Sequence, residues 1–177
     1  MIAIIDYGIG NLKSVHNAVR YIAPKTPSKV SSDPDFIYKA DKVIFPGQGA
    51  MPDCIKELDK RGIRDVVIES AKKKPFLGIC VGMQVLAEKG YENGEHQGLG
   101  WVSGVANKLE VKNFPLPHIG WNDVIVKKES QLFKGLKEIK DFYFVHSYKL
   151  VTDENYILTE TNYEVNFCSS IQKDNIY

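Results

Sequence analysis

The sequence has no long hydrophobic run and no excess of charge of either sign. Its longest mostly apolar stretch, Pro75–Ala87, is interrupted by Gly and Gln and is too short to cross a bilayer as a helix. Lysine and arginine together number 23 against 22 acidic residues, a formal net charge of +1. This balance gives no electrostatic reason to expect nucleic acid or an anionic membrane as a partner. We therefore expect no nucleic-acid partner and no membrane association.

Cysteine is also scarce. The three cysteines, Cys54, Cys80 and Cys168, are odd in number and show no Cys-x-x-Cys spacing. A disulfide framework and a zinc ribbon are therefore not expected, and no metal or cofactor is predicted. The N-terminal segment Met1–Asp6 has neither a basic region nor a cleavage site, so it predicts a buried first strand rather than a signal peptide. These features together predict a cytoplasmic protein.

Length and composition indicate one folded domain. The chain has 177 residues, of which 44% are hydrophobic and 11% aromatic, which suits a single core and excludes a disordered chain. In the first half, short apolar runs alternate with helical patterns, which is typical of a parallel sheet covered on both faces. The second half is rich in strand patterns and predicts antiparallel pairing. The predicted fold is α/β, with a mixed, mostly parallel central sheet, flanking helices and an antiparallel second half within one domain, 1–177.

The expected elements follow from these patterns. Asn11 is expected to cap a helix that ends before Pro24. Further helices are predicted at Met51–Lys60, Ile63–Lys73 and about Gly82–Lys89. Strands are predicted at Met1–Asp6, Asp41–Phe45, Phe76–Ile79, Val105–Val111, His118–Val126, Phe142–Tyr148, Tyr156–Glu160 and Phe167–Gln172.

The most informative local motif is Gly78-Ile79-Cys80-Val81-Gly82. From three cysteines and a glycine frequency of 14 in 177, about 0.02 Gly-x-Cys-x-Gly motifs are expected by chance. The motif follows an apolar strand and precedes a helical pattern, the context of a nucleophile elbow with Cys in place of Ser. A following helix would favour a thiolate at Cys80, and the Val81 N–H would face an oxyanion. The alternative is a buried, inert cysteine.

Two further features fit a cysteine hydrolase. The glycine-rich turn Pro46–Ala50 follows another predicted strand, and its backbone is a candidate for a second oxyanion donor. By itself it is also an ordinary turn. His118 and His146 lie near strand ends, where site residues gather in open α/β sheets. Spacing does not show that either meets Cys80, and a structural role remains the alternative for each.

Five segments resemble one protein family in their order and spacing: Asp6–Asn11, Pro46–Ala50, Gly78–Gln84, Pro117–Asn122 and Phe142–Tyr148. Together they resemble the glutaminase subunits of imidazole glycerol phosphate synthase, which are class I, triad-type glutamine amidotransferases. The resemblance runs from residue 1 to residue 177. The elbow alone identifies only the amidotransferase superfamily, and the fourth and fifth segments narrow it to these subunits.

The resemblance implies a role for individual residues. Cys80 matches the nucleophile that attacks the side-chain amide of L-glutamine and forms a γ-glutamyl thioester. Gly47 and Gln48 match the oxyanion strand, and Val81 matches the second oxyanion donor. The matches for glutamine-binding residues are Gln84, Glu92, His146, Ser147 and Tyr148. His146 thereby resembles a binding residue and not the general base.

The resemblance also implies a partner and a pathway. These subunits form a heterodimer with a (βα)8-barrel cyclase subunit and pass ammonia to it for histidine biosynthesis. The residues that resemble parts of the contact surface are Asn11, His118, Trp121 and Asn122. An alternative is a paralog that supplies ammonia for modified surface sugars, and a second is a catalytically inactive binding partner of the cyclase.

One departure from the family pattern concerns the segment Ser169–Tyr177. In the family, a similar segment is followed by a strand and turn with the catalytic His and Glu, and then by a final helix. No residue of 1–177 matches that His or Glu. We therefore expect this domain to lack the family's C-terminal strand, turn and helix and to have very little glutaminase turnover.

Overall fold

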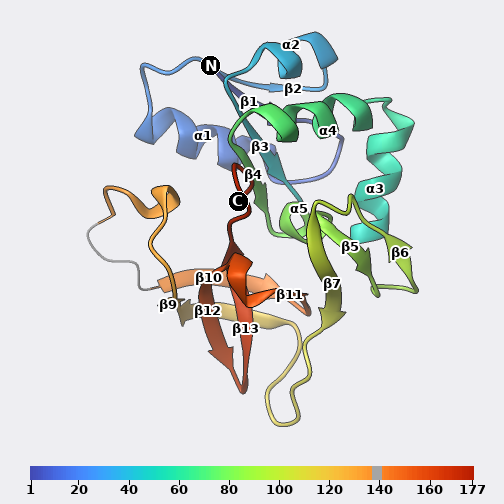
Figure 1. The fold of residues 1–177 in the computed structure, drawn as a ribbon, viewed down its shortest axis with the longest axis vertical. Helices are drawn as coiled ribbons and strands as arrows, with labels where there is room; N and C mark the ends of the chain where they lie inside the picture. Colours follow the sequence, from blue (N-terminus) through green and yellow to red (C-terminus); the bar gives the residue numbers. More distant parts are fainter. Residues whose placement is uncertain (137–140) are drawn as a thin grey trace.

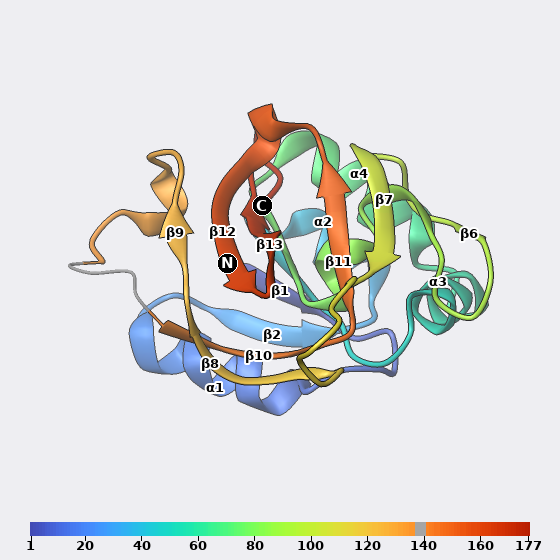
Figure 2. The same ribbon diagram turned by 90° about the horizontal axis from the view of Figure 1, so that it is seen from below.

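The computed structural model describes residues 1–136 and 141–177 and contains a four-stranded parallel sheet in the order β2-β1-β3-β4 (Figure 1). Its strands are β1 (Ile2–Ile5), β2 (Ser28–Ser31), β3 (Lys42–Pro46) and β4 (Phe76–Ile79). The helices that connect them are α1 (Leu12–Ile22), α2 (Pro34–Lys39), α3 (Met51–Lys60) and α4 (Arg64–Lys73). Figure 2 shows α1 on one side of this sheet and α2 and α4 on the other.

The second half forms two further sheets. A seven-stranded sheet has the order β6-β5-β7-β11-β13-β12-β9, and all its neighbours are antiparallel except β5 and β7. Its strands are β5 (Ala87–Gly90), β6 (His96–Gln97), β7 (Val102–Lys108), β9 (Ile125–Val126), β11 (Tyr148–Thr152), β12 (Ile157–Tyr163) and β13 (Val165–Ile171). Strands β8 (His118–Asp123) and β10 (Asp141–His146) pair separately as an antiparallel ribbon. Two 3₁₀ turns complete the described part, at Gln131–Phe133 and Glu154–Tyr156.

Local capping explains where the first two helices begin. The Asn11 side chain accepts a hydrogen bond from the Ser14 N–H at 3.3 Å, which confirms it as the cap of α1. Asp33 caps α2 by accepting from the Asp35 N–H at 3.0 Å, and Pro34 occupies the first helical position. Both α2 and β2 were absent from the sequence prediction, because neither has a long apolar pattern.

The helix expected over Gly82–Lys89 is wrong in length. Helix α5 spans only Val81–Gln84, and the chain turns into β5 at Ala87. The reason is competition for carbonyl groups. The Leu99 N–H donates to the Val85 carbonyl at 2.7 Å, and the Gly100 N–H donates to the Ala87 carbonyl at 3.0 Å. These tertiary hydrogen bonds use acceptors that a longer helix would need.

A single hydrophobic cluster joins the parallel and antiparallel halves. Four aromatic rings cross it in sequence, with centroid separations of 5.1 Å from Tyr7 to Phe45, 5.9 Å from Phe45 to Phe76 and 5.2 Å from Phe76 to Trp101. Such tilted and edge-on pairs suit the ring quadrupoles and hold β3 and β4 at a fixed separation. Within the described ranges, no helix is both long and apolar enough to cross a membrane.

The last residues of the chain lie along the outer edge of β4 (Figure 1). The Phe76 N–H donates to the Asn175 carbonyl at 2.9 Å, and the Gly78 N–H donates to the Tyr177 carbonyl at 2.8 Å. The backbone groups on this edge of β4 are therefore paired, which fixes the strand that leads directly into the Cys80 turn.

We predict that Gly82→Ala destabilises the fold, because a Cβ on Gly82 would collide with the backbone carbonyl of Phe45. The expected loss in the free energy of unfolding is about 3 kcal/mol. Gly62→Ala is the control, because Gly62 has φ +64° but open space around its Cα. It should cost only about 1 kcal/mol, from the left-handed backbone. Urea unfolding of both variants measures the difference, and equal losses would contradict the steric argument.

Candidate active site

Cys80 occupies a strained turn between β4 and α5. Its backbone has φ 59° and ψ −120°, a region that residues with a side chain rarely adopt, and its side chain is exposed. The strained turn lifts the side chain out of the β4–α5 connection, as in a nucleophile elbow. This geometry is what the Gly-x-Cys-x-Gly motif predicted.

The glycines on either side of Cys80 are required by close backbone packing. A Cβ on Gly78 would lie 2.8 Å from the Gly82 carbonyl carbon and 2.9 Å from the Met83 nitrogen. A Cβ on Gly82 would meet the Phe45 carbonyl, and a Cβ on Gly47 would meet the Gly82 nitrogen. The elbow therefore presses directly on the end of β3, and its glycines leave the room that the turn needs.

The electrostatics of Cys80 differ from the sequence expectation. We expected a helix dipole to favour the thiolate, but α5 is one turn long and contributes little. Desolvation by the surrounding protein raises the pKa of the Cys80 thiol, the Glu92 carboxylate raises that pKa further, and the Val81 N–H opposes them. Cys80 therefore rests as a thiol and needs a proton acceptor before it can attack.

The other two cysteines are poorer nucleophiles. Cys54 and Cys168 are both buried, and burial raises the pKa of each thiol to about 12. Of the three, Cys80 alone has an exposed side chain. The alternative of a buried, inert cysteine therefore describes these two residues and not Cys80.

In the segment predicted to supply an oxyanion donor, hydrogen bonds hold the peptide between Pro46 and Gly47. The Tyr7 hydroxyl donates to the Pro46 carbonyl at 2.7 Å, and the Gly47 N–H donates to the Ile79 carbonyl at 3.0 Å. Tyr7 is fully buried, and burial raises the pKa of its hydroxyl, so the donor keeps its proton. The Pro46–Gly47 peptide is thus held on both sides. Any reorientation must occur at the next peptide, between Gly47 and Gln48.

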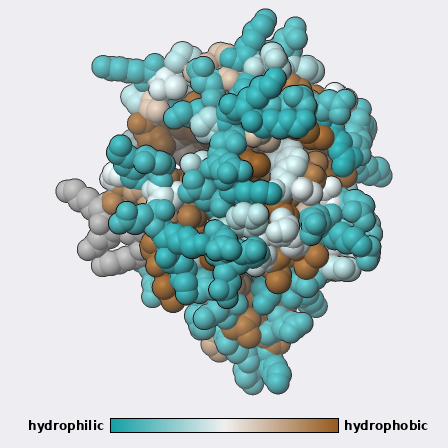
Figure 3. Space-filling model, in the orientation of Figure 1, coloured by the Kyte–Doolittle hydropathy of each residue, from teal (hydrophilic) through white to brown (hydrophobic). Residues whose placement is uncertain are grey.

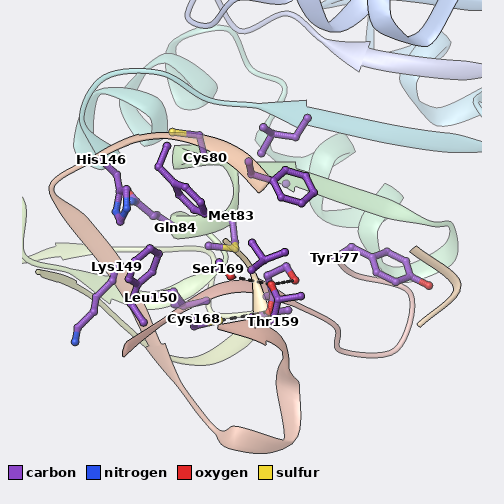
Figure 4. Close-up of a pocket in the computed structure, with 18 of the residues that line it drawn as sticks. Cys80, Met83, Gln84, His146, Lys149, Leu150, Thr159, Cys168, Ser169 and Tyr177 are labelled. Carbon is purple, nitrogen blue, oxygen red and sulfur yellow. Dashed lines mark hydrogen bonds between the residues drawn. The ribbon is translucent and has the colours of Figure 1, made fainter. Parts of the chain in front are cut away.

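A cavity of about 460 Å³ lies beside Cys80, within the range of small-molecule sites. Of the site residues predicted from sequence, Cys80, Gln84, His146 and Tyr148 line it. Figure 4 shows Cys80, Gln84 and His146 gathered on one side of the cavity, with Tyr177 on the other. The apolar lining was missed by the sequence analysis, because its residues read only as core: Met83, Leu150 and Phe167 among others.

The other two predicted binding residues, Glu92 and Ser147, are not among the residues that line this cavity. The Glu92 carboxylate accepts a hydrogen bond from the Met51 N–H at 3.2 Å, at the start of α3, and it is close enough to Cys80 to act on its pKa. Ser147 is half-buried, and its carbonyl accepts from the Leu109 N–H at 2.8 Å. Glu92 therefore joins the charge environment of the thiol, whereas the Ser147 backbone contributes to the adjacent sheet.

Both ring nitrogens of His146 are occupied. Its Nδ1 lies 2.9 Å from the Tyr148 carbonyl, and its Nε2 lies 2.9 Å from Nδ1 of His118. No other histidine of residues 1–136 and 141–177 lines the cavity with Cys80. This arrangement suits the expectation that His146 is not the general base, because neither nitrogen is free to take the thiol proton.

The strand β8 has two different faces, so the residues predicted for one contact surface do not all lie on the same side of it. His118 is 2% exposed and faces inward, where Asn122 hydrogen-bonds to it. Trp121 is 73% exposed and packs edge-on against Tyr143 of β10 at 5.7 Å. Asn11 is exposed at the start of α1. His118 therefore does not belong to the outer surface, whereas Trp121 does.

Metal ligands do not gather in the described part of the chain. Among residues 1–136 and 141–177, no group of three His, Cys, Asp or Glu side chains is placed to hold a metal ion.

Solved structures share this fold. A crystal structure of a glutamine amidotransferase superposes with a TM-score of 0.68 at 16% identity, over 90% of this chain and 79% of that one. PurLQS from Thermotoga maritima superposes with a TM-score of 0.63 at 16% identity, over 99% and 83%. At this identity the likeness concerns the fold alone, and it confirms the predicted α/β class.

Sequence comparison identifies the family. The subunit HisH of imidazole glycerol phosphate synthase from Nitrosomonas europaea is 44% identical over 185 residues, which cover 99% of this chain and 87% of the relative. The HisH subunit from Aquifex aeolicus is 46% identical over 176 residues, covering 98% and 84%. The family model for class-I glutamine amidotransferases matches residues 3–177. The resemblance seen in the five sequence segments is thus confirmed, and the chain belongs to the class-I glutamine amidotransferase family.

Proposed function

We propose that the protein is the glutaminase subunit of an imidazole glycerol phosphate synthase, and that it hydrolyses L-glutamine to glutamate and ammonia for histidine biosynthesis. The observation that carries this proposal is the exposed Cys80 thiol, held in a strained elbow at the edge of a cavity that Gln84 also lines. The names of the 41–46% identical relatives support the histidine pathway over a surface-sugar paralog.

The proposed chemistry is covalent catalysis in two steps. The Cys80 sulfur, once its proton is removed, attacks the side-chain carbonyl carbon of glutamine and forms a tetrahedral intermediate. The carbon–nitrogen bond then breaks, the nitrogen takes up a proton and leaves as ammonia, and a γ-glutamyl thioester remains on Cys80. Water attacks the thioester, which releases glutamate and restores the thiol. Both steps need proton transfer, and neither His118 nor His146 has a ring nitrogen free for it.

The negative oxygen of the tetrahedral intermediate needs two donors. We assign the first donor to the Val81 N–H, which directly follows Cys80 and lowers its pKa. We assign the second donor to the Gln48 N–H, because the preceding peptide is pinned by Tyr7 and by the Ile79 carbonyl. Rotation of the Gly47–Gln48 peptide alone would bring this donor toward the oxyanion, and the missing side chain of Gly47 permits that rotation.

We propose a cyclase subunit, a (βα)8 barrel, as the partner that receives the ammonia, with its docking surface on the β8–β10 ribbon. The relatives are themselves named as subunits of a synthase. The ribbon carries an exposed apolar cluster in which neighbours face one another across the strands, namely Ile119, Trp121, Tyr143 and Val145. Exposed apolar clusters of this kind mark protein contacts. On the different face shown in Figure 3, hydrophobic residues form small patches scattered among hydrophilic ones.

The test of catalysis is glutamate release by the chain in complex with its cyclase, and the wild-type rate is expected to be low because neither His118 nor His146 has a ring nitrogen free to move a proton. Cys80→Ser should lower this rate by a factor of about 10³ or more, because the nucleophile is lost. Cys54→Ala is the matched control, since it removes a thiol outside the cavity, and it should retain the wild-type rate. A wild-type complex that binds glutamine but releases no glutamate would instead support an inactive binding partner.

We predict that iodoacetamide modifies Cys80 before Cys54 and Cys168, because those two are buried. Peptide mass mapping of the folded protein measures the order. The rate at Cys80 should keep rising with pH past about 8.5, the ordinary thiol value, because its pKa is raised. L-Glutamine should slow the reaction by filling the cavity. Preferential labelling of either buried cysteine would argue against the elbow as the reactive site.

We predict that Trp121→Ala weakens binding to the cyclase about 30-fold, the effect of losing an aromatic anchor of about 2 kcal/mol. Trp121 is 73% exposed, so the variant should keep its fold. Tyr38→Ala is the matched control, because Tyr38 is 54% exposed on α2, which lies at the top of Figure 1, away from β10 of the ribbon. Calorimetric titration with the cyclase compares them, and equal affinities for the two variants would exclude the ribbon as the docking surface.

A further inference from the structure

A continuous series of hydrogen bonds runs beneath the β8–β10 ribbon toward the cavity. The Asn122 Nδ2 donates to the Asn162 carbonyl at 2.9 Å and lies 3.3 Å from His118 Nε2. His118 Nδ1 lies 2.9 Å from His146 Nε2, and His146 Nδ1 lies 2.9 Å from the Tyr148 carbonyl. The series therefore connects the inner face of β8 with a residue that lines the cavity.

The end at Tyr148 determines which nitrogens carry hydrogen. A backbone carbonyl only accepts, so His146 must donate from Nδ1. In the neutral ring, Nε2 is then an acceptor, and His118 must donate to it from Nδ1. The Nε2 of His118 is in turn an acceptor, and it receives the Asn122 amide hydrogen. Hydrogen bonds are therefore donated in one direction along the series, from Asn122 to the Tyr148 carbonyl.

The end at Asn122 prevents the opposite direction. Its Oδ1 accepts a hydrogen bond from the Asp123 N–H at 2.8 Å, and its Nδ2 donates to the Asn162 carbonyl. Turning the amide over would place like groups against each other at both contacts. Asn122 thus presents only a donor to His118, so a hydrogen on His118 Nε2 would have no acceptor.

The surroundings of the two imidazoles also disfavour charge. Phe144 and Tyr163 stack on the His118 ring, with centroids 5.0 Å and 4.0 Å away, and Phe167 lies 4.7 Å from the His146 ring. The titratable hydroxyl of Tyr163 points elsewhere and donates to the Pro115 carbonyl at 2.8 Å. Burial lowers the pKa of both histidines, and His146 lowers that of His118 further. Both rings are therefore neutral, in the same Nδ1–H tautomer.

The Tyr148 carbonyl receives a second hydrogen bond, from the Gln84 side chain. The Gln84 Nε2 lies 3.2 Å from that carbonyl, and Gln84 is buried at the cavity. Because the carbonyl is an acceptor, the amide must turn its nitrogen toward Tyr148. Its Oε1 is then left to accept a hydrogen bond from a donor group of a bound ligand.

We propose that His118 and His146 form a tautomer-locked positioning relay, which holds the Tyr148 carbonyl and thereby sets the Gln84 amide for glutamine binding. The proposal rests on the glutaminase function proposed above. Neither histidine exchanges a proton with the substrate. Their role is to orient the Gln84 amide. The series of hydrogen bonds begins on the inner face of β8, and the outer face of the same strand carries Trp121.

The tautomers can be observed directly in the wild-type chain by ¹⁵N-histidine NMR, with long-range correlations from the ring protons. His118 and His146 should each show a protonated Nδ1 and an unprotonated Nε2. This pattern should persist at pH 6.5, where a free imidazole is half protonated. Replacing each of the four histidines in turn assigns the signals. A charged ring at pH 6.5, or an Nε2–H tautomer at either position, would overturn the proposal.

Two matched variants test whether the relay matters for glutamine. His118→Asn keeps an amide nitrogen near the Nδ1 position and so retains a donor toward His146. His118→Gln places its amide near the Nε2 position and loses that donor, and both variants lose the same stacked ring. In the cyclase complex, His118→Gln should raise the KM for glutamine on the order of fivefold more than His118→Asn does, with a smaller change in kcat.

The outcomes distinguish a failure of the relay from a failure of the proposed glutaminase function. Equal KM values for the two variants would reduce His118 to a packing residue and would overturn the relay. If neither variant folds, the NMR tautomers of the wild-type protein decide alone. If the wild-type complex does not turn over glutamine, the proposed function fails, whereas the NMR spectra still report whether the two rings are locked.

Discussion

The close approach of Gly82 to the carbonyl of Phe45 is the contact on which the site depends. It presses the start of α5 against the end of β3, so the chain has no room to leave β4 except through the strained turn at Cys80. The Tyr7 hydroxyl and the Ile79 carbonyl then hold the first peptide after β3. Backbone packing within the rigid parallel sheet thus places the proposed nucleophile and the proposed oxyanion strand.

The antiparallel half contributes the other side of the cavity. Gln84 from the parallel half reaches across to the Tyr148 carbonyl, which belongs to β11 of the seven-stranded sheet. The same carbonyl receives His146 from β10. One acceptor therefore ties α5 to the consecutive strands β10 and β11, and its two donors are the Gln84 amide and the His146 ring. A site assembled in this way is sensitive to the tautomer of a histidine that never touches the reacting atoms.

The proposed docking surface and the proposed relay lie on opposite faces of the β8–β10 ribbon because strand side chains alternate. Ile119 and Trp121 point outward with their cross-strand neighbours, whereas His118 and Asn122 point inward. A partner that docks on the outer face presses on the same backbone that positions the relay. Coupling between a docked subunit and the glutamine cavity then needs no movement of the parallel sheet.

The sequence alone determined the elements whose signals are local. The strand before Cys80 and the glycines around it follow from apolar runs and from the steric needs of a sharp turn, and Asn11 follows from the capping rule. Tertiary structure alone decided the length of α5, because Leu99 and Gly100 compete for its carbonyls.

Tertiary structure also decided the ionisation of Cys80 and the pairing of the two histidines. Desolvation and Glu92, neither of which appears in a linear motif, raise the pKa of Cys80. His118 and His146 are 28 residues apart and meet only because β8 and β10 pair in one register. Sequence periodicity can place a residue on a strand, but the partner across the sheet is fixed by how the whole chain buries its apolar faces.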